Sequence, residues 1–208
     1  MEEAAEVPAP PRRTTGLRRR VEIVAAAARL FAQQGYHTVG MREIAEAVGI
    51  RGASIYNHFS SKEEILYAIA LKMTKEPLEQ HLSLLDAAGT PAQRLASLVA
   101  AHVRNLADHQ VEHLVSLREL PALSPEHLER VTDYRMYYQR RIRDVIIAGA
   151  RAGEFAVDDP TLAAIAILDM MNGISWWLPA DHDVDALVAS YVGYAISGLL
   201  QHRTGARP

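Results

Sequence analysis

The sequence predicts an all-α fold of about nine helices, and three observations lead to that prediction. Apolar residues recur at the three- and four-residue spacing of amphipathic helices along most of the chain. Strand-like alternation of apolar and polar residues never persists for more than a few positions. Pro-containing start signals precede several apolar runs, and Gly residues follow others, as is typical of helix ends. With 208 residues, 49% of them hydrophobic, the chain is long enough to bury a substantial core.

The first three predicted helices are close neighbours in the sequence. Apolar spacing predicts a helix over about 17–34, with Gly35 where a C-terminal cap belongs. A second helix over about 41–48 ends at Gly49, and a third, short helix follows over about 52–58. Two short helices therefore flank a tight glycine turn.

A long helix follows these three. Ser60 and Ser61 precede two glutamates, so a hydroxyl group caps the first turn and the acidic residues favour the helix start. The helix is expected from Lys62 to about Leu85, and Pro77 is expected to kink or shorten it, because proline lacks an amide donor. The remaining helices are predicted at about 90–107, 109–120, 124–152, 159–177 and 183–202.

Charge divides the chain into a basic and an acidic part. Residues 11–62 hold nine Lys or Arg against three Glu, whereas residues 76–208 hold eleven Arg against seventeen Asp or Glu. A small basic segment favours a polyanionic partner, and a solvated arginine cluster without a partner is the alternative. The absence of cysteine excludes disulfides, thiolate zinc sites, iron–sulfur clusters and cysteine nucleophiles.

The strongest functional signal lies between residues 35 and 67. Two short helices joined by a glycine turn are typical of a helix-turn-helix, whose second helix enters the DNA major groove. The accessible side of that second helix is expected to hold Arg51, Ser54, Asn57 and His58, which are side chains suited to bases and phosphates. An ordinary helical hairpin is the alternative.

The residues of this segment resemble the N-terminal domain of TetR/AcrR transcriptional regulators. The resemblance covers about 50 residues and lies in Phe31, Gly35, Arg42-Glu43-Ile44-Ala45, Gly49, Tyr56-Asn57-His58-Phe59 and Ser61-Lys62-Glu63-Glu64. It implies a regulator that binds double-stranded operator DNA. By that resemblance the phosphate contacts are Arg42, Ser54, Tyr56, His58 and Lys62, and the base contacts are Arg51, Gly52 and Asn57.

Three positions depart from the family pattern. Gly40 stands where Ser or Thr usually caps the second helix, Arg51 replaces a small polar residue, and Gly52 replaces a Lys or Arg. These departures leave the base preference open. The arginines between residues 12 and 20 are either a DNA-following arm or a solvated tail.

The same resemblance implies the domain organisation and a homodimer. The chain divides into a flexible arm (1–16), the helix-turn-helix domain (17–63), a ligand-binding and dimerisation domain (64–202) and a tail (203–208). Small residues at Ala186, Ser190, Gly193 and Ser197 form a stripe that allows close helix approach, which favours an interface built from the last two helices. An intramolecular helix pair is the alternative.

The ligand-binding domain has candidate pocket residues of two kinds, apolar walls and polar fixers. They are His102, Leu106, His113, Leu117, Arg118, Tyr134, Tyr138, Arg141, Met170, Asn172 and Trp177, and each of these residue types also occurs in ordinary cores and surfaces. The arginine cluster Arg135, Arg140, Arg141 and Arg143 suits carboxylate or phosphate, which fits an acyl-coenzyme A effector. Genomic base composition is the alternative reason for the arginines. The C-terminal half also looks like acyl-coenzyme A-responsive members that control fatty-acid or sterol breakdown.

The expected mechanism is a repressor that leaves a pseudo-palindromic operator when an effector binds, with the helix from Lys62 to Leu85 as the lever. Two alternatives are a regulator of an efflux or other catabolic operon that responds to a hydrophobic drug-like ligand, and a DNA-binding protein without a small effector. A closed interior without a cavity would favour the second.

An enzyme is the remaining alternative, and the sequence does not favour it. His109, Glu112 and His113 match the H-x-x-E-H zinc pattern, but no third ligand is indicated, and hydrolase and nucleotide signatures are missing. We therefore expect no enzymatic activity, no cofactor and no metal. The longest apolar stretch, 162–178, is interrupted by Asp169 and Asn172, so we expect no membrane span and a cytoplasmic protein.

Overall fold

The computed structural model describes residues 12–179 and 181–201, with side chains from residue 16 onward. The described residues form nine α-helices and no strand, which confirms the predicted all-α fold. The chain divides into two compact units, unit 1 up to Ala68 and unit 2 from Ile69. The predicted tail (203–208) and most of the predicted arm lie outside the described residues.

Unit 1 consists of α1 (Arg12–Gln34), α2 (Met41–Ala47), the 3₁₀-helix η1 (Gly52–Asn57) and the beginning of α3 (Lys62–Leu85). α1 begins at Arg12 rather than at residue 17, so the end of the expected arm is helical. α1 packs on α2, and α2 packs on η1. Their shared core is fully buried and consists of Ile23, Ala27, Phe31, Ile44, Ala45, Ile55 and Phe59.

Glycines end the first two helices as predicted. Gly35 has φ +85° and Gly49 has φ +69°, which is the left-handed conformation that glycine adopts without strain. Gly40 occupies the N-cap of α2 and supplies no side-chain hydrogen bond. The third element is a 3₁₀-helix and not the α-helix expected over 52–58, since it has only six residues between two turns.

α3 has the predicted bounds and the predicted cap. Ser61 Oγ accepts a hydrogen bond from the Glu64 amide at 3.1 Å, and Glu64 Oε2 accepts one from the Ser60 amide at 2.8 Å. These two bonds satisfy amides that have no partner within the helix. Pro77 lies inside the helix and does not end it, so the expected shortening is wrong.

Unit 2 continues α3 with six further α-helices. They are α4 (Pro91–Asp108), α5 (Gln110–Arg118), α6 (Pro125–Arg151), α7 (Pro160–Asn172), α8 (Ile174–Trp177) and α9 (Val184–Gly193), with 3₁₀-helix η2 (Leu120–Ala122) and π-helical turn η3 (Tyr194–Leu199). Thr90, Ser124, Asp159 and Asp183 cap four of these helices with side-chain oxygens. Proline follows the first three of these caps at the first helical position, where its missing amide costs nothing.

Two predicted helices are broken in the structure. The helix expected over 159–177 divides at Gly173. Beyond the break, Gln110 Nε2 donates to the carbonyls of Ser175 at 3.3 Å and Leu178 at 2.9 Å and holds α8 against α5. The helix expected over 183–202 leaves α-helical geometry after Gly193. The wider π turn buries Leu200, whose carbonyl accepts a hydrogen bond from the Ala156 amide at 3.0 Å.

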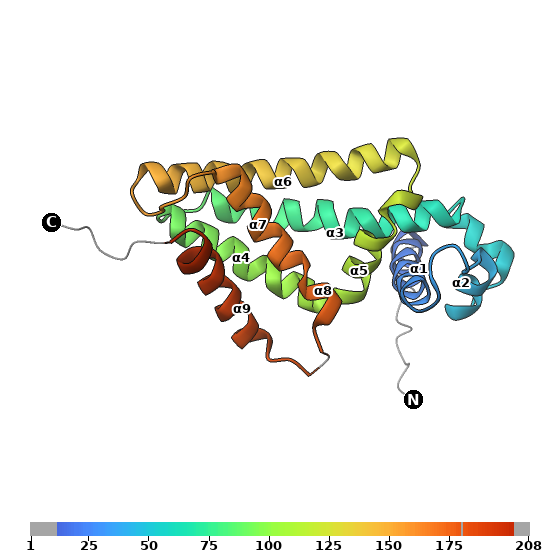
Figure 1. Cartoon of the computed structure of the whole chain (residues 1–208). Helices are drawn as coiled ribbons and strands as arrows, with labels where there is room; N and C mark the ends of the chain where they lie inside the picture. Colours follow the sequence, from blue (N-terminus) through green and yellow to red (C-terminus); the bar gives the residue numbers. More distant parts are fainter. Residues whose placement is uncertain (1–11, 180, 202–208) are drawn as a thin grey trace, which may run out of the picture. The chain divides into compact units, whose positions relative to one another are not determined.

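α4 is the central helix of unit 2 and packs against α6, α7 and α9 (Figure 1). α6 and α7 also lie side by side. The fully buried residues at the centre include Leu95, Leu98, Val99, Ile142, Ile146, Ala164 and Ile167. Within the described ranges, no helix combines the length and hydropathy that a membrane span requires.

Candidate functional site

Residues 51–58, called the reading segment below, present polar side chains to solvent around the buried side chain of Ile55. Ile55 of η1 is fully buried, whereas Arg51 and Asn57 are exposed and Tyr56 is 57% exposed. A 3₁₀-helix has three residues per turn, so Arg51, Ser54 and Asn57 lie on one face. The structure therefore brings two of the expected base contacts, Arg51 and Asn57, together with one expected phosphate contact.

The other expected contacts of this segment are placed differently. Gly52 and His58 lie three residues to either side of the buried Ile55 and are half-buried, as Ser54 is, so a DNA contact by His58 stays a prediction. Gly52 contacts α2, since a Cβ atom there would lie 3.7 Å from Arg42 Cγ. Arg42 itself is 88% exposed and forms an ion pair with Glu46 at 3.1 Å.

Lys62 holds the loop between α1 and α2. Its Nζ donates to the carbonyls of Tyr36 and Val39 at 2.7 Å and to that of His37 at 3.3 Å. The same atom lies 4.5 Å from the centre of the Tyr36 ring, a cation–π distance. The three ammonium donors are thus all occupied within unit 1, and a phosphate contact by Lys62 stays a prediction.

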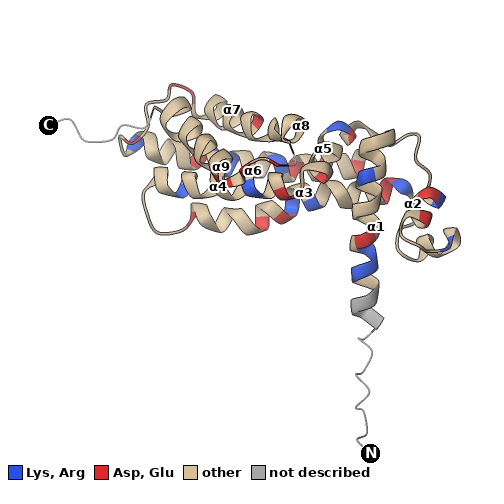
Figure 2. Cartoon of the chain, turned by 90° about the horizontal axis from the view of Figure 1, so that it is seen from below, with Lys and Arg blue, Asp and Glu red and all other residues tan. Residues whose placement is uncertain are grey.

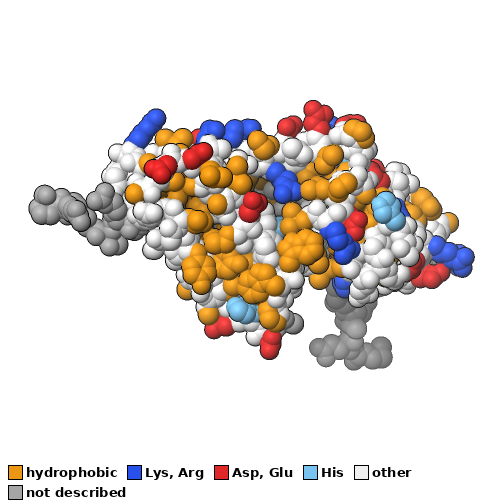
Figure 3. Space-filling view, viewed as in Figure 1, with side chains coloured by type: hydrophobic (Ala, Val, Ile, Leu, Met, Phe, Trp, Pro, Cys, Tyr) orange, Lys and Arg blue, Asp and Glu red, His pale blue; other side chains and the backbone are white. Residues whose placement is uncertain are grey.

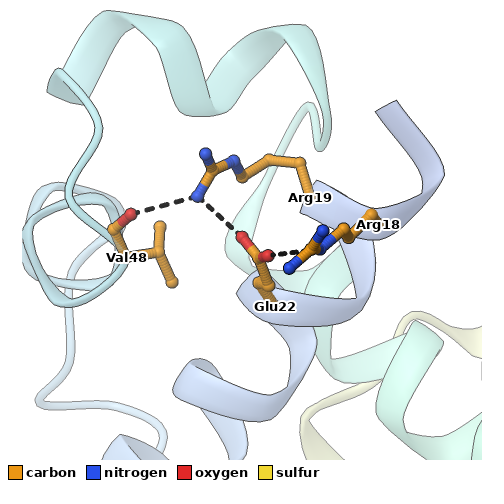
Figure 4. A network of polar contacts seen from close by, with 4 residues as sticks. All are labelled: Arg18, Arg19, Glu22 and Val48. Atoms are coloured by element: carbon orange, nitrogen blue, oxygen red, sulfur yellow. Dashed lines mark hydrogen bonds and ion pairs between the residues drawn. The ribbon is translucent and has the colours of Figure 1, made fainter. Parts of the chain in front are cut away.

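Two arginines of α1, Arg19 and Arg20, donate hydrogen bonds to backbone carbonyls at the ends of α2 and η1. Arg19 Nη1 donates to the Val48 carbonyl at 3.3 Å and to Glu22 Oε2 at 2.7 Å, and Arg18 pairs with the other oxygen of Glu22 at 3.4 Å (Figure 4). Val48 is the C-cap of α2, where a cation compensates the negative end of the helix.

Arg20 makes the equivalent contact at the end of η1. Its Nη1 donates to the carbonyl of His58, the C-cap of η1, and its guanidinium lies 3.9 Å from the centre of the Phe59 ring. Figure 2 marks the basic residues of α1 and α2 in blue. From the sequence, the arginines between residues 12 and 20 were expected to form either a DNA-following arm or a solvated tail. Neither expectation included the contacts of Arg19 and Arg20 to backbone carbonyls.

Unit 2 contains a partly open cavity of about 130 Å³ between α3, α4, α5, α6 and α7. Its lining includes six of the expected pocket residues, His102, His113, Leu117, Tyr134, Tyr138 and Asn172. The rest of the lining is Met73, Thr74, Pro77, Ser116, Arg135, Gln139, Ile165, Leu168 and Asp169. A closed interior would have favoured a protein without a small effector, and the interior is not closed.

The other five expected pocket residues lie outside this lining. Leu106 is buried in the core, Met170 packs against the core, and Trp177 is 51% exposed. Arg118 pairs with Glu119 at 2.8 Å. Arg141 pairs with Asp86 at 2.6 Å, since it lies about one turn beyond Tyr138 on α6.

Arg135 is the cavity arginine that sequence reasoning did not select. It belongs to the arginine cluster of α6, and its place next to Tyr134 on a helix that also contributes Tyr138 is the signal that points to it. Burial lowers the pKa of Arg135, and the nearby Asp169 carboxylate raises it. The α3 residues of the lining, Met73, Thr74 and Pro77, were also not expected there, and no comparable signal in the sequence points to them.

The inner wall of the cavity is polar but uncharged at neutral pH. Tyr138 Oη lies 3.1 Å from His102 Nδ1 and 3.4 Å from His81 Nδ1, and His113 Nδ1 lies 2.6 Å from Ser175 Oγ. Burial, with smaller effects of His113 and His81, lowers the pKa of His102 to about 3. Burial and the charge of Arg135 lower the pKa of His113 to about 4. Burial raises the pKa of Tyr138.

The three residues of the H-x-x-E-H pattern are bound to different partners. His109 Nδ1 lies 3.1 Å from the Asn105 carbonyl, and Glu112 pairs with Lys72 at 3.0 Å. His113 faces Ser175, as described above. Within the part of the chain that the structure describes, no cluster of three His, Cys, Asp or Glu side chains has the arrangement of a metal site.

Comparison with known families decides what kind of protein combines this reading segment and this cavity. The model of bacterial regulatory proteins of the tetR family matches residues 23–69, and the model of the tetracyclin repressor-like C-terminal domain matches residues 88–199. The chain belongs to the tetR family. It is thus a ligand-responsive, DNA-binding transcriptional regulator with the fold that the sequence predicted.

Known relatives of this tetR-family protein agree over most of its length. A regulatory protein of the tetR family from Rhodococcus RHA1 is 34% identical, with a TM-score of 0.77, over 86% of this chain and 96% of that one. The structure of AibR in complex with isovaleryl coenzyme A and operator DNA is 25% identical, with a TM-score of 0.76, over 86% and 98%. The transcriptional repressor KstR2 of Rhodococcus jostii is 28% identical over 87% and 91%.

In unit 2 of this tetR-family protein, apolar and small side chains of α7, α8, α9 and η3 are exposed. Leu162 is 61% exposed, Trp176 62% and Tyr194 57%. The small-residue stripe of Ala186, Ser190, Gly193 and Ser197 is exposed as well. Figure 3 shows hydrophobic side chains gathered over α7, α8 and α9.

Proposed function

We propose that the protein is a homodimeric repressor that leaves a pseudo-palindromic operator when an acyl-coenzyme A thioester occupies the cavity of unit 2. The observation that carries the proposal is the presence, in one chain, of an exposed reading segment and a cavity lined by Arg135. Such a regulator acts in the cytoplasm, where bacterial DNA is, and has no catalytic activity.

At the operator, the reading segment divides its contacts by residue type. Arg51 binds guanine and Asn57 binds adenine in the major groove, while Gly52 allows close approach of the backbone. Arg42, Ser54, Tyr56 and His58 bind phosphates and set the register, and Lys62 joins them when its ammonium group exchanges one loop carbonyl for a phosphate oxygen. A dimer places two such segments in successive major grooves, which is why the operator is a pseudo-palindrome.

The effector class is supported by charge and by a relative. Guanidinium groups suit carboxylates and phosphates, and α6 places Arg135 at the cavity. AibR, which is similar over most of the chain, has been crystallised with isovaleryl coenzyme A. A hydrophobic drug-like effector is the competing class, favoured by the apolar wall of Met73, Pro77 and Leu168.

The dimer is supported by the exposed face of α7 to α9. Small residues let two helices approach closely, and the exposed large side chains beside them gain from burial against a second copy. α3, which begins in unit 1 and continues in unit 2, is the lever through which effector binding favours a spacing of the reading segments that no longer fits the operator.

A fluorescence-anisotropy titration tests the proposal. The protein is titrated against the intergenic DNA upstream of its own gene at fixed salt, because phosphate contacts make the affinity strongly salt-dependent. Nanomolar binding that isovaleryl-, octanoyl- or palmitoyl-coenzyme A reverses is the expected result. Binding that responds to an apolar drug panel and to no thioester supports the competing class, and absence of specific binding contradicts the operator part.

A further inference from the structure

The inner wall of the cavity holds a polar atom whose hydrogen bonding is incomplete. His102 lines the cavity and is 9% exposed, and its Nε2 is buried with no hydrogen-bond partner of standard geometry among the described residues. The Asn172 side chain, which also lines the cavity, makes a weaker polar contact that raises the pKa of His102 slightly against the effect of burial. Buried polar atoms are nearly always hydrogen-bonded, since an unsatisfied one loses its water without compensation. A buried atom of a cavity-lining side chain with only this weak contact is therefore a place where a ligand atom can complete the hydrogen bonding.

The proton on the Tyr138 hydroxyl decides what that atom can bind. The hydroxyl lies between His102 Nδ1 and His81 Nδ1, at 3.1 and 3.4 Å, and has one proton to donate. If it donates to His102, the other nitrogen of that ring carries a proton and is a donor. If it donates to His81, His102 Nε2 is an acceptor. The wall thus suits a keto oxygen in one state and a hydroxyl group in the other.

The charge around His102 excludes an ionic group at this end of the ligand. His113, His81 and Tyr138 surround it, and all of them are buried. Burial lowers the pKa of His102 and His113 well below neutrality, so neither imidazole carries a charge at neutral pH, and the guanidinium of Arg135 acts on His113 rather than on His102. Arg135 and the exposed Asp169 also line the cavity, so the charged part of a ligand is accommodated there instead.

The volume suits one small ring at the inner end of this partly open cavity. The cavity measures about 130 Å³, close to the roughly 150 Å³ of an engineered apolar cavity that takes benzene. Met73, Pro77 and Leu168 supply apolar contacts for such a ring.

We propose that the cavity takes an effector whose buried end is a single small ring bearing an uncharged hydroxyl or keto oxygen, which hydrogen-bonds to His102 Nε2. The thioester end of the effector, which rests on the proposed function, leaves the cavity past Arg135. A long saturated acyl chain buries a methyl group against His102 and is bound less tightly.

Two ligands of the same shape test whether the ligand oxygen contributes to binding. Isothermal titration calorimetry compares 4-hydroxybenzoyl-coenzyme A with 4-methylbenzoyl-coenzyme A, which replaces the hydroxyl group by a methyl group. The wild-type protein is expected to prefer the hydroxyl compound by about tenfold, the effect of one buried hydrogen bond. His102→Phe keeps the ring and removes Nε2, so the preference disappears. His182→Phe, an exposed histidine outside the cavity lining, keeps it.

The free acids separate this proposal from the effector class. If 4-hydroxybenzoate and 4-methylbenzoate show the preference and the thioesters do not bind, the oxygen contact stands and the thioester class fails. If octanoyl-coenzyme A binds and neither ring compound does, or if the wild type binds both ring compounds equally, the oxygen contact is overturned. If none of these compounds binds, both fail.

A spectroscopic measurement covers the case in which His102→Phe does not fold. The ¹⁵N chemical shift of His102 Nε2 in the wild-type protein is expected to move when the hydroxyl compound binds and not when the methyl compound binds. An equal shift with both ligands overturns the proposal.

Discussion

The candidate DNA contacts of unit 1 all come from residues 42–62, whereas the cavity of unit 2 collects side chains from five helices between Met73 and Asn172. The two regions also treat polar groups differently. Arg19 and Arg20 satisfy backbone carbonyls at the ends of α2 and η1, while His102 Nε2 at the cavity has no hydrogen bond of standard geometry among the described residues. A rigid support suits a surface that reads a fixed double helix. An incomplete hydrogen-bond network suits a binding site in which the ligand supplies the remaining hydrogen bond.

The largest expected effect is a loss of operator binding by unit 1 that leaves ligand binding by unit 2 unchanged. Arg51→Ala removes the exposed arginine of the reading segment and is expected to weaken operator binding by about 10- to 100-fold, the loss of one bidentate contact to a base. Ligand binding in unit 2 is expected to stay unchanged. Anisotropy measures the first and calorimetry the second.

Arg130→Ala is the matched control for this prediction. It removes the same charge from an exposed residue of α6 that pairs with Glu126 on its own helix. Equal losses of operator affinity in the two variants would show that Arg51 acts only through net charge.

The second prediction concerns pH and unit 2 alone. His102 and His113 bind protons in the folded state only near pH 3 and 4, but near 6.5 in the unfolded chain. The unfolded state therefore binds more protons between these values, and stability falls as the pH is lowered from about 6.5 toward 4. Urea unfolding at pH 7.5 and 5.0 measures the loss, which we expect to be about 2 kcal/mol for His102.

The variant His102→Phe sharpens that result. Its unfolding free energy is expected to change less between the two pH values than that of the wild type, because one buried imidazole is gone. The same pH dependence in both proteins would contradict the buried, uncharged state of His102.

The smallest expected effect concerns the support of the reading segment. Arg19→Gln loses a contact to the Val48 carbonyl and is expected to weaken operator binding by about three- to tenfold, in line with about 1 kcal/mol for a hydrogen bond. The slope of log affinity against log salt is expected to stay the same, since Arg19 binds protein and not phosphate. A slope reduced by about 0.9 would instead reveal a phosphate contact.

Arg18→Gln is the control on the same turn. Its side chain is 84% exposed and contacts Glu22 but no carbonyl of the helix-turn-helix. It is expected to leave affinity at high salt unchanged, so a loss as large as that of Arg19→Gln would argue against the supporting role.

Sequence reasoning succeeded where short spacing determines structure. The caps at Gly35, Gly49 and Ser61 were predictable because each depends on a residue type and its immediate neighbours. The family resemblance over residues 31–64 has the same origin. The 3₁₀ geometry of η1 was not predictable, since periodicity over six residues does not distinguish it from an α-helix.

Long-range contacts account for the rest. Arg135 and Arg141 lie on the same helix, and only the position of Asp86 decides that Arg141 pairs outside the cavity lining. The contact that holds α8 against α5 comes from Gln110, more than sixty residues away along the chain from Ser175 and Leu178. No local pattern contains such information.

The three carbonyl contacts of Lys62 have a consequence for protein engineering. Lys62 is the first residue of α3, yet it fastens the loop between α1 and α2. A hybrid that grafts this DNA-binding part onto another sensor must therefore keep the opening turns of α3 with the donor. A junction placed before Lys62 would separate the loop from its clamp, whereas one after Ala68 transfers both together.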